Sequence, residues 1–172
     1  PLANRFIHLN LDADIDSFKE YALGRNLDER LIAFLAFRPE LLHNHATGHS
    51  AWPSPRSWEM ASQLLTADIP LQHAVGDAAA AEFEAFIKIY QSLPELEPIL
   101  KGKTDLEFPK EPSARYAVTV GLTIRSTTPK RAEYAIEWMG RNAPMEWFQL
   151  FAGDLITRLR KSGKGGELVK SV

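Results

Sequence analysis

The sequence contains no cysteine, and this absence removes several classes of chemistry at once. Thiolate nucleophiles, iron–sulfur clusters and cysteine-ligated zinc sites all require this residue. No apolar run approaches the roughly 20 residues that cross a bilayer, and no signal peptide is visible, so we expect a cytoplasmic protein without a membrane partner. An excess of basic residues is also lacking, because 20 Lys and Arg stand against 22 Asp and Glu. The net charge of −2 argues against a nucleic-acid partner.

Helical patterns dominate the 172 residues, so we predict a mainly α fold, a helical lid-type bundle. Residues 12–14 (DAD) are expected to supply a turn and the N-cap of a helix that carries Ile15, Phe18 and Ala22 and ends at Gly24. Ser54 and Pro55 predict a second helix start, because Ser is a good N-cap and the missing N–H of Pro costs nothing at the first helical position.

Later segments predict further helices. Asp77 is expected to cap a long amphipathic helix, and Pro144 to open a last helix with a wide apolar stripe. Four prolines make residues 92–112 an expected extended connector. Residues 116–124 (YAVTVGLTI) fit both a strand and a helix, and we favour a helix because a strand here would have few partners.

Residues 6–11 (FIHLNL) alternate apolar and polar side chains, which predicts a short strand at the N-terminus. A strand needs neighbours that satisfy its backbone N–H and C=O groups, and the chain offers only residues 116–124 as a doubtful second strand. The segment is therefore expected to be the last strand of a sheet whose other strands are absent. The sequence also begins at Pro1 without an initiator Met, which suggests a piece of something longer.

Three motifs carry a resemblance when they are taken in order: NRFIHL at 4–9, RPELL at 38–42 and PSPRSWE at 53–59. Together they resemble the end of the core and the lid of a MoxR-type AAA+ ATPase. The resemblance implies that residues 1–12 end the AAA+ core, that 13–75 form the lid helices and that 76–161 form a C-terminal helical extension. Residues 162–172, rich in Gly and Lys, are expected to be a disordered tail.

Two arginines receive roles from this resemblance. Arg56 corresponds to the sensor 2 residue, which contacts the γ-phosphate of ATP; at the second position of a helix it also lies in a corner that favours anions. Arg5 corresponds to a candidate arginine finger, a catalytic group that reaches the nucleotide site of a neighbouring subunit and so implies a ring oligomer. Without the resemblance, Arg56 would be a solvated arginine at its own helix start, and Arg5 a surface arginine at a strand edge.

The sequence lacks a phosphate-binding G-x-x-x-x-G-K-[ST] motif, and it lacks an apolar strand that ends in Mg²⁺-binding carboxylates. ATP and Mg²⁺ are therefore expected cofactors of the intact protein only, and the chain alone should not hydrolyse ATP. The resemblance implies chaperone-like remodelling of a partner, often a protein with a von Willebrand A domain. The alternative hypothesis is a stand-alone helical interaction module without a nucleotide role.

Two other groups of residues are candidate sites. His43, His45 and His49 have a spacing that could suggest zinc, but a polar loop without a carboxylate favours a solvated connection, so no metal site is predicted. Near the C-terminus, four aromatic residues are expected in the core, with an exposed docking patch left open: Trp138, Trp147, Phe148 and Phe151.

Overall fold

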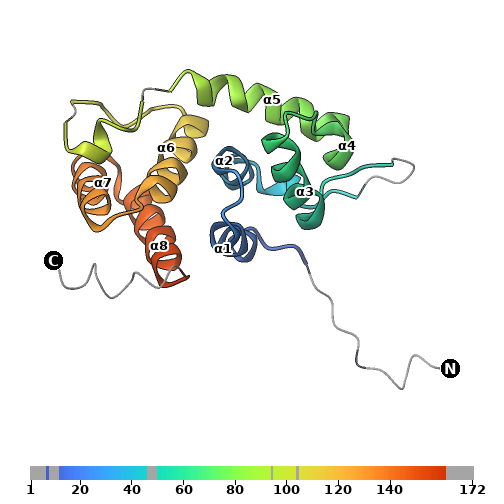
Figure 1. Ribbon diagram of the computed structural model, residues 1–172, viewed down its shortest axis with the longest axis horizontal. Coiled ribbons are helices and arrows are strands. Elements are labelled where there is room, and N and C mark those ends of the chain that lie inside the picture. Colours follow the sequence, from blue (N-terminus) through green and yellow to red (C-terminus); the bar gives the residue numbers. More distant parts are fainter. Residues whose placement is uncertain (1–6, 8–11, 46–49, 94, 104, 162–172) are drawn as a thin grey trace.

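The computed structural model describes residues 7, 12–45, 50–93, 95–103 and 105–161 (Figure 1). Within these ranges all regular structure is helical, which confirms the predicted mainly α class. The α-helices are α1 (Ile15–Arg25), α2 (Glu29–Phe37), α3 (Pro55–Thr66), α4 (Gln72–Val75), α5 (Asp77–Gln91), α6 (Pro112–Arg125), α7 (Pro129–Asn142) and α8 (Met145–Lys161), and the 3-10 turns are η2 (Pro39–Leu41) and η3 (Ile99–Lys101). The predicted strand at 6–11, apart from Ile7, and the tail at 162–172 lie outside the described residues.

Two helix starts form as the sequence predicts. The Asp14 carboxylate accepts a hydrogen bond of 2.7 Å from the backbone N–H of Ser17 and so caps α1. At α3, the Ser54 hydroxyl accepts from the Ser57 N–H at 3.1 Å, while the Ser57 hydroxyl accepts from the Ser54 N–H at 2.8 Å. This reciprocal capping box, with Pro55 at the first position, fixes the direction in which α3 leaves the loop.

Two predicted helix boundaries are wrong. Gly24 lies inside α1, and Asn26 ends the helix in the left-handed conformation, which its short polar side chain tolerates. Asp77 is the first residue of α5, and the N-cap is Gly76. Gly76 has a φ of +81°, and a Cβ there would lie 2.8 Å from the carbonyl oxygen of Ala51, so both the conformation and the close approach require glycine.

Residues 116–124 form a helix, as favoured, because they belong to α6. The strand-like alternation arises from burial on two sides. Ala117 and Val120 pack in one hydrophobic cluster, whereas Val118 and Leu122 pack in another. A helix buried on both faces therefore loses the single apolar stripe by which an amphipathic helix is recognised.

The first hydrophobic cluster is formed by α1 to α5 and one face of α6 (Figure 1). Its centre is Phe34, whose ring centroid lies 5.7 Å from that of Trp58, 5.3 Å from that of Phe83 and 5.6 Å from that of Phe86. The cluster extends across the predicted boundary at residue 75, because α5 and α6 contribute to the same core as the expected lid helices. The division into lid and extension stays a prediction.

The second cluster is formed by the other face of α6, α7, α8 and the segment before α6. That segment was predicted to be an extended connector, but it contains η3 and buries Leu96, Ile99 and Leu100. The prolines did not prevent this, because a 3-10 turn needs only three residues and Pro98 can precede it. In the described part of the chain, no helix combines the length and apolar character needed to cross a membrane.

Candidate functional site

Arg56 occupies the second position of α3, on the turn that the capping box fixes. Its side chain is exposed. Beside it lies an open pocket of about 390 Å³, between the first turns of α1 and α3. The pocket is lined from the α1 side by Asp14, Phe18 and Tyr21, and from the α3 side by Pro55, Arg56 and Glu59.

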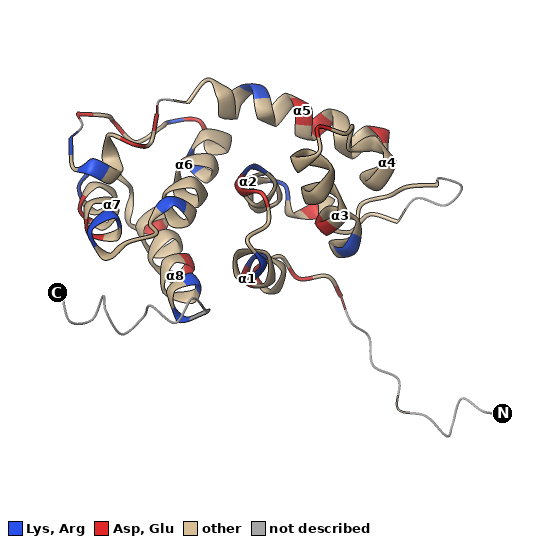
Figure 2. Ribbon diagram, viewed as in Figure 1, with Lys and Arg blue, Asp and Glu red and all other residues tan. Residues whose placement is uncertain are grey.

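Arg56 differs from Arg30 and Arg38 because its guanidinium has no partner among the described residues. Figure 2 shows where basic and acidic residues lie along the helices. Within the described ranges the side chain of Arg56 has no ion pair or hydrogen bond. By contrast, Arg30 pairs with Asp28 at 2.6 Å, and Arg38 pairs with Glu40 and Glu82. The guanidinium of Arg56 is therefore available to an anion from outside this part of the chain.

The carboxylates of the pocket are already engaged. The Tyr21 hydroxyl donates to Glu59 at 2.8 Å, and Arg25 lies against the Tyr21 ring. The hydrogen bond from the Ser17 N–H holds the pKa of Asp14 below its ordinary value, so this carboxylate is charged at neutral pH.

One arginine thus shares the pocket with two carboxylates, Asp14 on the α1 side and Glu59 on its own helix. A fork-shaped guanidinium at a helix N-terminus suits a phosphate oxygen, because the helix dipole and the charge act in the same direction. The two carboxylates oppose an anion, so firm phosphate binding would require additional cationic groups. This balance agrees with the absence of a phosphate loop from the sequence.

Arg5 lies outside the described residues, so the structure does not place it relative to Arg56. The chain nevertheless reaches α1 at this pocket, because Asp14 is both the N-cap of α1 and a lining residue.

His43 and His45 are exposed in the loop after η2, and the ring of His45 meets that of Trp52 edge-on at 5.0 Å. His49 lies outside the described ranges. Within those ranges no three His, Asp or Glu residues are grouped as a metal site. The three-histidine pattern is therefore not tested as a whole.

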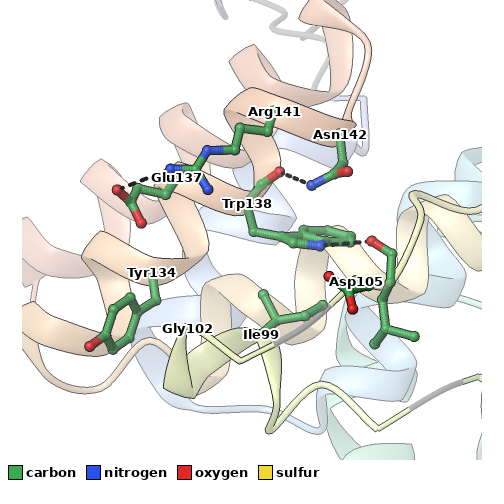
Figure 3. A pocket seen from close by; sticks show the side chains of 9 residues that line it. Ile99, Gly102, Asp105, Tyr134, Glu137, Trp138, Arg141 and Asn142 are labelled. Carbon is green, nitrogen blue, oxygen red and sulfur yellow. Dashed lines mark hydrogen bonds and ion pairs between the residues drawn. The ribbon is translucent and has the colours of Figure 1, made fainter.

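A second pocket, of about 360 Å³, lies between η3 and α7 (Figure 3). Its polar groups contact one another. The Trp138 indole N–H donates to the Leu106 carbonyl at 3.0 Å, the Asn142 amide donates to the Trp138 carbonyl at 2.9 Å, and Arg141 lies 3.6 Å from Glu137. Sequence reasoning missed this pocket, because its lining residues Tyr134 and Trp138 were expected to point into the core.

The C-terminal aromatic residues are mainly core. Trp138 and Phe151 are buried, whereas Trp147 and Phe148 are half-buried. Trp147 packs edge-on against Tyr116 at 4.7 Å and carries the Arg115 guanidinium over its ring at 5.8 Å. These contacts cover part of the Trp147 ring, and Trp138 and Phe151 lie in the core as expected.

Comparisons with protein families, curated proteins and solved structures gave no match to this chain.

Proposed function

We propose that this chain is the lid and helical extension of a MoxR-type AAA+ ATPase, in which Arg56 reads the γ-phosphate of ATP bound by a preceding core. One observation carries the proposal: Arg56 is a guanidinium without a partner among the described residues, held at the start of α3 in a pocket that it shares with the start of α1. The motif PSPRSWE, which contains Arg56, supports the same assignment.

The arrangement explains how a lid could respond to nucleotide. A core attached before α1 would lie next to Arg56, since Asp14 and Arg56 line one pocket. A core that holds the phosphate would supply the cationic groups that the pocket lacks, and Arg56 would add a bidentate contact to the phosphate. Because α1 and α3 both begin here, this contact would move the two helices together.

The remaining parts of the proposal follow the resemblance. Arg5 would act as a finger in the site of the next subunit of a ring, and the core would bind ATP and Mg²⁺. The protein would remodel a cytoplasmic partner, such as one with a von Willebrand A domain. The isolated chain would not hydrolyse ATP, because it has no phosphate loop.

The decisive experiment measures ATP turnover of the intact protein with Arg56→Ala. We expect a loss of about tenfold or more, comparable to the removal of one charged donor from a transition state. Arg56→Lys should recover part of the activity, because it keeps the charge without the planar fork. The matched control is Arg141→Ala on α7, an exposed arginine with a 3.6 Å ion pair, which should leave turnover unchanged.

Unchanged turnover in Arg56→Ala would reject the sensor role and favour the interaction module. A simpler test reads the gene upstream of Pro1. A phosphate loop followed by an acidic strand should lie within roughly 100 to 200 residues, about one domain. A reading frame that begins at or just before Pro1 would contradict the ATPase assignment.

A further inference from the structure

The contact between α1 and α8 is held by a buried ion pair. The Lys19 ammonium lies 2.9 Å from the Asp154 carboxylate, and the two side chains are only 6% and 16% exposed. Among the described residues, no α1 side chain belongs to the second hydrophobic cluster and no α8 side chain belongs to the first. The two helices therefore meet outside both cores, through charge.

The surroundings of this pair do not favour a tight contact. A pocket of about 340 Å³ lies beside it, lined by Asp16, Ser17, Glu20 and Gly153 among others. A Cβ added to Gly153 would have no neighbour within 4 Å, so the packing does not require glycine here. Glycine inside a helix is less stable than alanine, and α8 is therefore weakened at this position. Water can thus reach the contact from the pocket.

The energetics of the pair also favour release. Burial raises the pKa of Asp154, and the nearby charge of Asp16 acts in the same direction, while Lys19 only partly offsets them. A buried ion pair commonly stabilises no more than apolar side chains of the same size, since both charges lose their hydration. If the contact opens, Lys19 can pair with Asp16, which lies three residues earlier on the same helix.

We propose that the Lys19–Asp154 contact is a releasable joint, at which the part of α8 that follows Gly153 separates from α1 and opens, while the first hydrophobic cluster and the rest of the second stay folded. Phe151, which precedes Gly153, keeps the first part of α8 attached to the second cluster when the joint opens. The opening is a local event of the kind that native-state hydrogen exchange detects.

Helix α1 lies between the pocket beside Arg56 and the Lys19–Asp154 joint with α8. Phe18 and Tyr21 line the pocket beside Arg56, whereas Lys19 points to α8, and Ser17 borders both pockets. In terms of the proposed function, on which this consequence rests, a movement of α1 at the Arg56 pocket would reach α8 only while the joint is closed. Coupling between two sites is reciprocal, so the state of α8 would bias the pocket in turn.

The test is amide hydrogen exchange of the 172-residue chain without nucleotide, so its result does not depend on the role of Arg56. Asp154→Asn leaves the buried Lys19 cation without its partner, and we expect exchange in the last two turns of α8 to rise by about tenfold or more. The double variant Lys19→Met/Asp154→Leu should instead slow exchange below that of the natural chain, because an apolar contact has no charge to hydrate.

Two further variants make the result specific. Gly153→Ala should also slow exchange in these turns, because alanine favours the helix and meets open space. Glu137→Gln removes one charge from an exposed pair on α7 and should change nothing in α8. The proposal is overturned if Asp154→Asn accelerates exchange equally in α2, α5 and α8, or if the double variant exchanges no more slowly than the natural chain.

Discussion

The two hydrophobic clusters differ in the residues and in the secondary-structure elements that form them. The first is an aromatic cluster in which the ring of Phe34 contacts three other rings, each supplied by a helix that the sequence pattern indicates. The second is closed by a segment without a long helix, which contributes Leu96, Ile99 and Leu100. The comparison shows that side chains from α-helices form the centre of the first core, with Leu41, Leu42 and Leu71 added from outside them, whereas the second core depends more on a short irregular segment.

The helices that surround the first cluster are also joined by an ionic link at the end of α6. Glu29 of α2 accepts hydrogen bonds from the Arg125 guanidinium and from the Tyr90 hydroxyl of α5. Burial and the Glu29 carboxylate raise the pKa of Tyr90, and the hydrogen bond to Glu29 raises that of Arg125. The link therefore holds α2, α5 and α6 in one arrangement, unlike the Lys19–Asp154 joint.

The largest effect is expected at the centre of the first cluster. Phe34→Ala should lower the free energy of unfolding by about 3–5 kcal/mol, because the cavity cannot close against three rings. The measurement is urea denaturation followed by Trp fluorescence. Since α6 belongs to both clusters, variants that keep only Trp58 or only Trp138 should report one shared midpoint; two separated midpoints would show that the clusters unfold independently.

A smaller effect is expected in the second cluster. Leu100 is 1% exposed, so Leu100→Ala should cost about 2–4 kcal/mol, at the lower part of the range if the irregular segment moves to fill the space. The control is Ile69→Ala, at a side chain 44% exposed, which should stay within about 0.5 kcal/mol. Equal costs at the two sites would contradict the assignment of residues 95–101 to the core.

The third-largest loss of stability is expected at the ionic link between Glu29 and Arg125. Glu29→Gln leaves Arg125 without its carboxylate, and because both groups are partly exposed we expect a loss of about 1–3 kcal/mol. Glu133→Gln, which removes the exposed partner of Lys130 on α7, is the matched control and should cost under about 1 kcal/mol. A loss for Glu29→Gln no larger than that of the control would contradict a stabilising role for the Glu29–Arg125 pair.

The smallest change in stability is expected from the titration of Asp14 and Asp154. The pKa of Asp14 is lowered in the folded chain, so its cap stabilises α1 above the unfolded pKa of about 3.8 and is lost as the pH falls through the folded value. The pKa of Asp154 is raised, so its contribution runs the other way: stability decreases as the pH rises above about 3.8. Urea midpoints between about pH 3 and 6 should therefore show a smaller acid loss in Asp14→Asn and a larger one in Asp154→Asn; shifts in the same direction would contradict the two assignments.

Local sequence signals predicted much of the fold. Ser54 and Pro55 placed the start of α3 because capping is decided by neighbours within one turn. The turn at η3 could not be predicted, because Leu96, Ile99 and Leu100 are ordered by α7, more than thirty positions away in the sequence. For the site, the sequence indicated Arg56 and its helix position, but the pocket shared with Asp14 depends on how α1 and α3 pack, which no local pattern contains.

The shared helix α6 has a consequence for how such a chain can evolve. If helices α1 to α5 were transferred to another protein, the first cluster would lose Ala117 and Val120 and the link from Glu29 to Arg125. The transferred piece would carry an open apolar groove where α6 had been. A piece that ended after α6 would instead expose Val118 and Leu122, which pack in the second cluster, so the helices from α1 to α8 are expected to be transferred as one unit.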